Sequence, residues 1–429
     1  MKRFFIFWFS ITCVLRMANG QSSYVTTDGT QFFYDGKPYY FMGTNFWYGL
    51  NLGSKGPGGD RDRLIRELDR LQAMGITNLR IMAGSEGPDD EPWRMVPALQ
   101  TSQGVYNPEV LDGLDFLLAE MGKRKMFAVV CLNNFWPWSG GMAQYLVWQK
   151  GGRIPYPPPA EGGDWGTYQV FTTGFYTNES AMKAFEDYLA FIIQRTNPYT
   201  GKAYRDDPAI MAWQLANEPR GILRPEAYRT WIERSAAFIK TLDKNHLVTI
   251  GSEGATSSKF AGTRFPKDHA IPNIDYTTIH IWVQNWGWYD PDKGEASLPD
   301  AEAKARKYLL KHVKQAKRLH KPLVLEEFGI SRDNDNHEAD SPATVRDSYY
   351  RFVFSQIYEL AESGTPVAGV NFWAWGGEGR PREPHAVWKA GDDFIGDPPH
   401  EYQGWYSVYD KDESTIRIIR EFAEKMKGL

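Results

Sequence analysis

The sequence predicts an α/β protein built as a closed (β/α)8 TIM barrel. Eight short strand-like runs alternate along the chain with amphipathic helical stretches. The runs are almost continuously apolar, which is typical of parallel strands that are covered on both faces. Eight such units fit a closed barrel with functional residues on the loops after the strands. An open doubly wound sheet is the alternative, but such a sheet is expected to carry a glycine-rich phosphate-binding turn, which we do not find.

The first predicted unit shows the pattern that repeats along the chain. A strand at 39–45 precedes a helix in which Leu64, Leu68 and Leu71 share one face and Gly75 can end the helix. The other strands are expected at 78–83, 126–134, 210–218, 246–254, 275–282, 321–330 and 368–377.

The helices that follow these strands are recognised by their caps and their periodicity. Asn107 is a suitable N-cap, and Pro108 suits the first turn, so a helix is expected to begin there. Between about 254 and 275 the helical pattern is the weakest of the set. The remaining helices are expected near 179–196, 225–243, 299–320, 342–363 and 413–427.

Two long insertions follow the third and the eighth strand. Residues 134–178 and 376–412 mix Trp, Tyr, Gly, Pro and charged residues, and neither is of low complexity. Long loops are usually functional or disordered, and this aromatic content favours ordered walls of a cleft. Because no linker or second domain is recognisable, residues 21–429 are expected to form one domain.

The first twenty residues predict a signal peptide. Lys2 and Arg3 precede an apolar run, and small residues follow at Ala18 and Gly20. A membrane anchor is the alternative, but the apolar stretch is shorter than the ~20 residues that a spanning helix needs. The protein is therefore expected to be exported, either secreted or periplasmic.

Charge and cysteine content narrow the function classes. The 49 basic residues fall to 46 once Lys2, Arg3 and Arg16 leave with the signal peptide, against 53 acidic ones, so the net charge is about −7. That charge argues against nucleic acid or an anionic membrane as partner. Cys131 is then the sole cysteine, which precludes an internal disulfide. Metal-binding and nucleotide-binding motifs are not found, so no metal or cofactor is expected, and the protein is expected to be a monomer.

Two glutamates end apolar runs on different predicted strands. Glu218 lies in "WQLANEPR" and Glu327 in "VLEEFG", on the fourth and seventh strands, and a barrel would bring both to one mouth. Side chains alternate along a regular strand, so only one of Glu326 and Glu327 can point into the barrel. Glycosidic bond cleavage needs two such carboxyls, about 5–5.5 Å apart if configuration is retained. A pair of ion-paired structural acids is the alternative.

Motifs across most of the chain support a family resemblance. The segments are "FMGTNFWYG", "GITNLRIMA", "WQLANEPR", "TIHIWVQNWGW", "VLEEFG" and "VNFWAW". In this order they resemble the endo-β-1,4-mannanases of glycoside hydrolase family five. The combination of "ANEPR" with "EEFG" is specific, whereas any single segment would be weak.

The resemblance implies roles for five residues around the bond to be cleaved. It implies that Glu218 is the acid/base and Glu327 the nucleophile, with Glu326 as an outward-facing neighbour. Asn217 matches the amide that binds the sugar 2-hydroxyl. Arg80 matches the arginine that keeps the nucleophile ionised.

The resemblance also implies a set of substrate-binding residues. His280 matches a histidine lining the site, and Arg220 an arginine on the leaving-group side. Trp373 matches the platform beneath the sugar bound just before the cleavage point. Many relatives carry tyrosine where this chain has Trp282, whose indole can donate but not accept a hydrogen bond. For three further tryptophans, sugar stacking and core packing are equally open: Trp47, Trp136 and Trp286.

These observations predict an exported, retaining endo-β-1,4-mannanase. Its expected partner is a β-mannan polysaccharide, such as mannan, glucomannan or galactomannan. A cellulase or other β-glucanase on the same barrel is the nearest alternative, because the two classes share the catalytic pair. A non-catalytic polysaccharide-binding protein is an alternative of another class, although pure binding has no need for two facing carboxyls.

Overall fold

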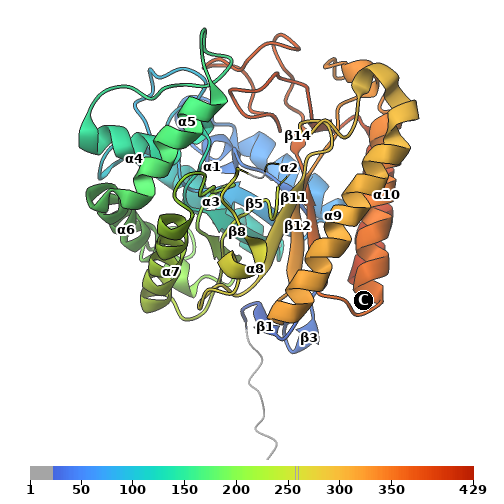
Figure 1. Cartoon of the computed structure of the whole chain (residues 1–429), viewed down its shortest axis with the longest axis horizontal. Coiled ribbons are helices and arrows are strands. Elements are labelled where there is room, and N and C mark those ends of the chain that lie inside the picture. Colours follow the sequence, from blue (N-terminus) through green and yellow to red (C-terminus); the bar gives the residue numbers. More distant parts are fainter. Residues whose placement is uncertain (1–22, 257, 259) are drawn as a thin grey trace, which may run out of the picture.

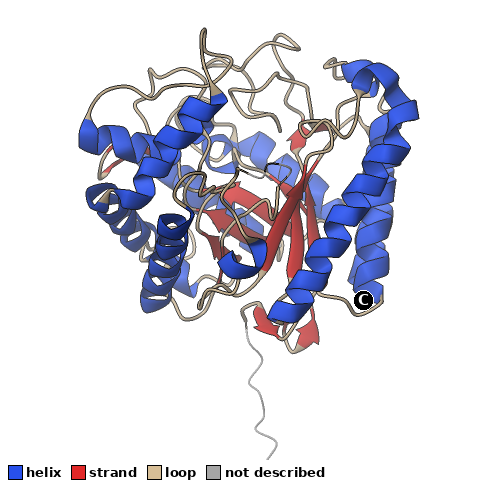
Figure 2. Ribbon diagram, viewed as in Figure 1, coloured by secondary structure: helices blue, strands red, loops and turns tan. Residues whose placement is uncertain are grey.

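A computed structural model describes residues 23–256, 258 and 260–429, and its centre is the predicted barrel (Figures 1 and 2). Seven parallel ladders join the eight strands in the order β10-β9-β8-β5-β4-β13-β12-β11. The ring closes between β10 and β11, where the Asp275 amide donates to the Val248 carbonyl at 2.8 Å. The strands are β4 (Phe41–Asn45), β5 (Asn78–Met82), β8 (Phe127–Cys131), β9 (Ile210–Gln214), β10 (Leu247–Thr249), β11 (Thr277–Ile281), β12 (Leu323–Phe328) and β13 (Val367–Phe372).

Helices surround the barrel, as Figure 2 shows in blue around red strands. The predicted cap is confirmed, because the Asn107 side chain accepts from the Glu109 amide at 2.9 Å. The weakest predicted helix shrinks to the four residues of α8 (Phe265–Asp268). The other barrel helices are α1 (Gly49–Leu52), α2 (Arg61–Ala73), α3 (Pro108–Lys123), α6 (Glu179–Ile193), α7 (Pro225–Leu242), α9 (Leu298–Leu319), α10 (Thr344–Glu362) and α11 (Glu413–Lys427).

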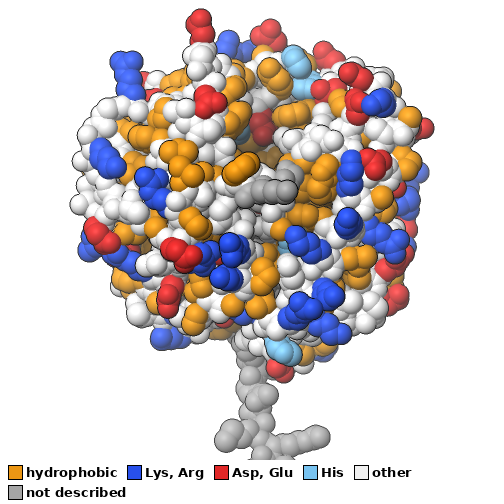
Figure 3. Space-filling model, viewed as in Figure 1, with side chains coloured by type: hydrophobic (Ala, Val, Ile, Leu, Met, Phe, Trp, Pro, Cys, Tyr) orange, Lys and Arg blue, Asp and Glu red, His pale blue; other side chains and the backbone are white. Residues whose placement is uncertain are grey.

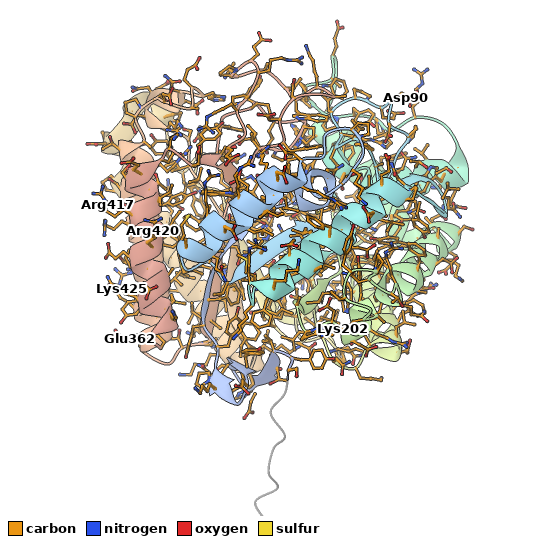
Figure 4. The ribbon with its side chains drawn as sticks, turned by 180° about the vertical axis from the view of Figure 1, so that it is seen from behind. Asp90, Lys202, Glu362, Arg417, Arg420 and Lys425 are labelled. Carbon is orange, nitrogen blue, oxygen red and sulfur yellow. The ribbon has the colours of Figure 1, made fainter. Side chains whose placement is uncertain are left out.

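Helix α11 illustrates how the amphipathic pattern places each helix. Ile419 and Phe422 are buried against the barrel. Arg417, Arg420 and Lys425 point outward along the edge of the molecule when it is seen from behind (Figure 4). The apolar stripe at i, i+3 and i+4 spacing therefore decides which face of the helix packs.

The two insertions are ordered and lie at the end of the barrel opposite β1 and β3 (Figure 1). Residues 134–178 form α4 (Gly141–Lys150) and α5 (Trp165–Thr172), and β14 (Trp375–Gly377) pairs with β15 (Val408–Tyr409) across residues 376–412. The prediction of ordered insertions is confirmed. The remaining short elements are β6 (Gln100–Ser102), β7 (Val105–Tyr106), η1 (Pro137–Ser139), η2 (Thr173–Thr177), η3 (Tyr204–Asp206), η4 (Pro291–Ser297) and η5 (Asp333–Asp335).

A small antiparallel sheet at the other end of the barrel is not foreseen by the sequence analysis. It consists of β1 (Thr26–Asp28), β2 (Gln31–Tyr34) and β3 (Lys37–Pro38). Its two tight turns are Asp-Gly pairs, in which Gly29 and Gly36 have positive φ angles of 58° and 73°. Asp-Gly between apolar residues is a strong hairpin signal, so the sequence did contain the information.

This sheet closes the lower end of the barrel through Phe32. Its ring is 0% exposed and stands edge-on to Tyr276, with ring centroids 5.2 Å apart. We expect Phe32→Ala to lower the free energy of unfolding by about 3–5 kcal/mol, because the neighbouring strand ends cannot collapse into the cavity. Denaturant unfolding would measure the loss. Val105→Ala, at a residue that is 54% exposed, is the control and should change stability little; equal effects would contradict this role of Phe32.

The predicted signal peptide, residues 1–20, lies outside the described residues, so export stays a prediction. Within the described part of the chain, none of the helices combines the length and the apolar character that crossing a membrane requires.

Candidate active site

Glu218 lies just beyond β9, at the carboxyl end of the fourth barrel strand. Its amide donates to the carbonyl of Gly251 at 2.9 Å, which ties this segment to the strand beside it. The φ angle of Glu218 is +48°, in a region that costs energy for a residue with a side chain. Its carboxyl makes hydrogen bonds with Trp136 Nε1 and His280 Nδ1, each at 2.6 Å. The structure thus holds a strained residue in one defined orientation.

Glu327 lies on β12, and the position of its neighbour Glu326 differs from the predicted one. The pairing of β12 with β11 shifts register beside His280, which marks a β-bulge. Both glutamates are consequently inside, each 2% exposed. Gln214 on β9 donates to the Glu326 carboxyl at 2.7 and 2.9 Å. The expectation that Glu326 faces outward is wrong, because side chains alternate only along a regular strand.

The carboxyls of Glu218 and Glu327 meet at His280. One carboxylate oxygen of each glutamate and a ring nitrogen of His280 all lie within 4.8 Å of one another. Nδ1 of His280 is 2.6 Å from Glu218 Oε1 and 3.2 Å from Glu327 Oε2. Retaining glycosidases hold their two carboxyls about 5–5.5 Å apart, whereas inverting ones need about 6.5–9.5 Å. The spacing fits the retaining arrangement.

His280 is completely buried between these acids. Burial opposes its charged form, but the charge of Glu327 and hydrogen bonds to Glu218, Glu326 and Glu327 raise the pKa of His280 well above its ordinary value. The spacing of His280, Glu218 and Glu327 would also suit a cation. A metal ligand must be the neutral imidazole, so the same three residues could hold an ion only with His280 deprotonated. With His280 protonated, the three residues form a hydrogen-bonded group in which two carboxyls share one imidazolium.

Arg80 on β5 connects the nucleophile candidate to the amide beside Glu218. Its guanidinium forms an ion pair with Glu327 and donates to Asn217 Oδ1 at 2.7 Å. It also donates to Asn45 Oδ1 at 3.0 Å and to Gln214 Oε1 at 2.7 Å. Arg80 is 4% exposed, and its charge is compensated inside the barrel rather than by water. The arginine therefore fixes Glu327 and Asn217 in one network.

A cavity of about 580 Å³ lies above these residues. Figure 3 shows the molecule hollowed near its centre, with an acidic side chain visible inside and hydrophobic side chains around the opening. Both insertions contribute to its walls, as the sequence predicts. The cavity is lined from these insertions by Trp136, Trp138, Pro158, Pro159, Trp165, Gln169, Pro398, His400, Glu401, Tyr402 and Trp405.

Arg220 lines the cavity beyond Glu218. Its guanidinium forms a two-point ion pair with Glu253 at 2.7 and 2.8 Å and donates to Gln169 at 3.0 Å. It also lies 4.8 Å from the centre of the Trp136 ring. Since Trp136 is hydrogen-bonded to Glu218, a continuous series of side chains runs from Glu218 through Trp136 to Arg220.

Aromatic residues predicted as sugar contacts separate into two groups. Trp282 and Trp373 line the cavity and stand edge to face, with ring centroids 5.8 Å apart. Trp136 and Trp286 line it as well. Trp47 does not: it is 2% exposed, and its indole donates to a backbone carbonyl at 2.9 Å. For Trp47 the structure supports the core-packing alternative instead of sugar contact.

Trp282 packs against other aromatic rings of the cavity wall. Among the described residues, Arg80 and His280 make polar contacts with the Glu327 carboxyl. The Trp282 ring packs on Tyr406 at 5.2 Å as well as on Trp373, so it acts as part of the wall.

Two further acids, which the sequence did not single out, line the cavity. Glu253 follows β10 much as Glu218 follows β9, so its place at a strand end was a usable signal. Burial raises the pKa of Glu253 and the nearby Glu218 adds to this, against the lowering effect of Arg220. Burial and the charges of Asp397, Glu327 and Glu218 raise the pKa of Glu401 well above its ordinary value. Glu401 lies in an irregular loop, where no periodic pattern marks it.

The two insertions touch each other beside the cavity. Trp165 on α5 packs edge-on against His400 of the second insertion, with ring centroids 6.2 Å apart. Trp165 also packs against Trp136 at 5.5 Å. The two insertions therefore meet at the wall of the cavity, which both residues line.

Comparisons with known proteins agree with this geometry. A family model described as GH family 5 beta-mannosidase-like matches residues 22–429. The crystal structure of a glycoside hydrolase family 5 mannosidase from Rhizomucor miehei superposes with a TM-score of 0.88 at 41% identity, covering 95% of this chain and 99% of that one.

Plant proteins are similar as well. Mannan endo-1,4-beta-mannosidase 7 of Arabidopsis thaliana is 33% identical over 364 residues, covering 82% of this chain and 77% of the plant protein. Mannan endo-1,4-beta-mannosidase 1 of Oryza sativa subsp. japonica is 31% identical over 370 residues, covering 82% and 78%. The resemblance seen in the sequence motifs is confirmed: this chain is a glycoside hydrolase of family 5 and belongs to its β-mannosidase-like group.

Proposed function

We propose that this enzyme hydrolyses β-mannosidic bonds with retention of configuration. The pair of carboxyls of Glu218 and Glu327, facing one another at the base of an aromatic cavity, carries the proposal. Two displacements at the same carbon restore the original configuration. The mannosidase-like family favours a mannoside over the glucan of a cellulase, and two facing carboxyls would be superfluous in a protein that only binds polysaccharide.

Glu327 is the proposed nucleophile. Its carboxylate attacks the anomeric carbon and forms a covalent glycosyl-enzyme while the bond to the leaving oxygen breaks. The ion pair with Arg80 keeps the carboxylate charged and fixes the oxygen that attacks. Arg80 also orients the amide of Asn217, which lines the cavity and can bind the sugar 2-hydroxyl.

Glu218 is the proposed acid/base. It gives its proton to the leaving oxygen in the first step and takes one from water in the second, and that water releases the sugar from Glu327. Trp136 and His280 hold its carboxyl in place throughout. The leaving sugar must lie on the Glu218 side of the bond, along the wall formed by Trp136 and Arg220.

We infer further that cleavage takes place near chain ends. Trp165 and His400 meet at the cavity wall, and a contact between the two insertions obstructs the middle of a long chain more than its end. The mannosidase from Rhizomucor miehei, at 41% identity, supports this inference. Internal cleavage, which the sequence motifs predict, is the second candidate and is supported by the similarity to the plant endo-mannosidases.

Product analysis distinguishes these two modes. With mannohexaose we expect mannose as the main early product, together with the chain shortened by one sugar. On polymeric mannan the reducing ends should increase while the viscosity falls slowly. A mixture of mannobiose, mannotriose and mannotetraose at early times, with a rapid fall in viscosity, would instead establish internal cleavage. A faster rate on soluble cellulose than on mannan would contradict the mannoside assignment.

A further inference from the structure

Three exposed apolar side chains lie within three residues of side chains that line the cavity. Phe260 is 83% exposed, Leu223 is 72% exposed and Val170 is 39% exposed. Each follows a residue that lines the cavity: Ser258, Arg220 and Gln169 respectively. Phe260 and Leu223 have the largest exposed fractions among the large hydrophobic side chains of the described residues.

Hydrogen bonds join the three segments that carry these side chains. The Ile222 amide donates to the Ala261 carbonyl at 3.0 Å, which places Leu223 and Phe260 on neighbouring backbone segments. Arg224 donates to the Val170 carbonyl at 3.4 Å and so connects the same loop to α5. We call these three side chains, Val170, Leu223 and Phe260, the exit rim.

The exit rim lies on the leaving-group side of the proposed site. The acid must stand beside the leaving oxygen, and the wall from Glu218 runs through Trp136 to Arg220. Leu223 comes three residues after Arg220, and Val170 comes directly after Gln169, which accepts a hydrogen bond from Arg220. Trp165 and His400 meet elsewhere on the cavity wall. A long leaving chain therefore has the rim in its path.

On the basis of the proposed function, we propose that the exit rim binds the distal part of a mannan chain. The apolar faces of sugar rings suit large, flat hydrocarbon surfaces, and an aromatic ring adds contact area with little conformational entropy to lose. Exposed apolar side chains that continue a binding cleft commonly mark an extension of it. The rim should therefore favour long leaving chains over short ones and leave the chemical step unchanged.

The test compares chain lengths in the double variant Phe260→Ala with Leu223→Ala. Both side chains are exposed, so the fold should be retained. We expect kcat/KM for mannohexaose to fall about three- to tenfold, mainly through KM, since one stacking contact and one aliphatic contact are lost. For mannobiose and 4-nitrophenyl β-mannoside the value should stay unchanged, because neither reaches the rim. A series from mannobiose to mannohexaose should show the length at which the loss begins.

A matched control removes an exposed apolar side chain elsewhere. Leu310→Ala, at a residue that is 42% exposed on α9, should behave like the unmodified enzyme on every substrate. Equal kcat/KM of the double variant and the unmodified enzyme on mannohexaose would overturn the proposal, as would an equal loss at all chain lengths. A lack of activity of the unmodified enzyme on all β-mannosides would instead refute the proposed function itself.

Discussion

Replacing Glu327 with Gln should reduce hydrolysis of mannan oligosaccharides by on the order of 10⁴-fold, because no nucleophile remains to form the covalent intermediate. The amide has nearly the volume of the carboxyl, so the variant should fold and still bind sugar. Steady-state kinetics with mannohexaose would measure the loss, and circular dichroism and calorimetric titration would verify folding and binding. In the unmodified enzyme, a 2-fluoro mannoside should label Glu327, which mass spectrometry can detect.

The adjacent acid supplies a matched control for this experiment. Glu326 is equally buried on the same strand, and its carboxyl accepts hydrogen bonds from Gln214. The nitrogen of His280 that contacts both Glu218 and Glu327 does not contact Glu326 at hydrogen-bond distance. Glu326→Gln should therefore cost far less activity, about tenfold or less, through the loss of a positioning contact. Activity of Glu327→Gln within tenfold of the unmodified enzyme would exclude it as the nucleophile.

Replacing Glu218 with Ala should produce a loss that depends on the leaving group. Natural chains leave as poor alkoxides and need the proton, so their turnover should fall by about 10²–10⁴-fold. A dinitrophenyl mannoside leaves without protonation, so its first step should continue and the glycosyl-enzyme should accumulate. Sodium azide should then accelerate turnover and yield β-mannosyl azide, because azide attacks without a general base. Burst kinetics and product NMR measure both effects.

Trp136, whose indole is hydrogen-bonded to Glu218, supplies the control for the acid/base experiment. Trp136→Phe removes the donor at 2.6 Å but leaves the carboxyl in place. We expect a smaller loss and no acceleration by azide. If Glu218→Ala instead loses activity to the same extent on natural and activated substrates, its role as acid/base is incorrect.

Much of the fold follows from local patterns in the sequence. The strand before Glu218 and the strand that carries Glu327 are both recognisable from short, mostly apolar runs, because burial on both faces leaves few polar positions. The helix cap at Asn107 is equally local, since it depends on a side chain and the next few amides. The two Asp-Gly turns before Phe41 carried a signal of the same kind that the sequence analysis did not use.

Tertiary contacts decided the positions that depend on more than one segment. Glu326 turned inward because the bulge arises from how β12 pairs with β11, and a single strand does not contain that pairing. Trp47 and Trp136 are alike as sequence signals, yet one is buried in the core and the other binds Glu218. Such differences are set by the neighbours that the closed barrel supplies.

The barrel, the family and the two glutamates at strand ends follow from local sequence, because periodicity and short motifs are properties of neighbouring residues. The way in which the insertions meet around the cavity depends on long-range contacts. The contact of Trp165 with His400 joins two insertions that follow different strands, and the exit rim joins the first insertion to the segments after β9 and β10. Contacts of this kind depend on where barrel closure places each loop, which no local pattern records.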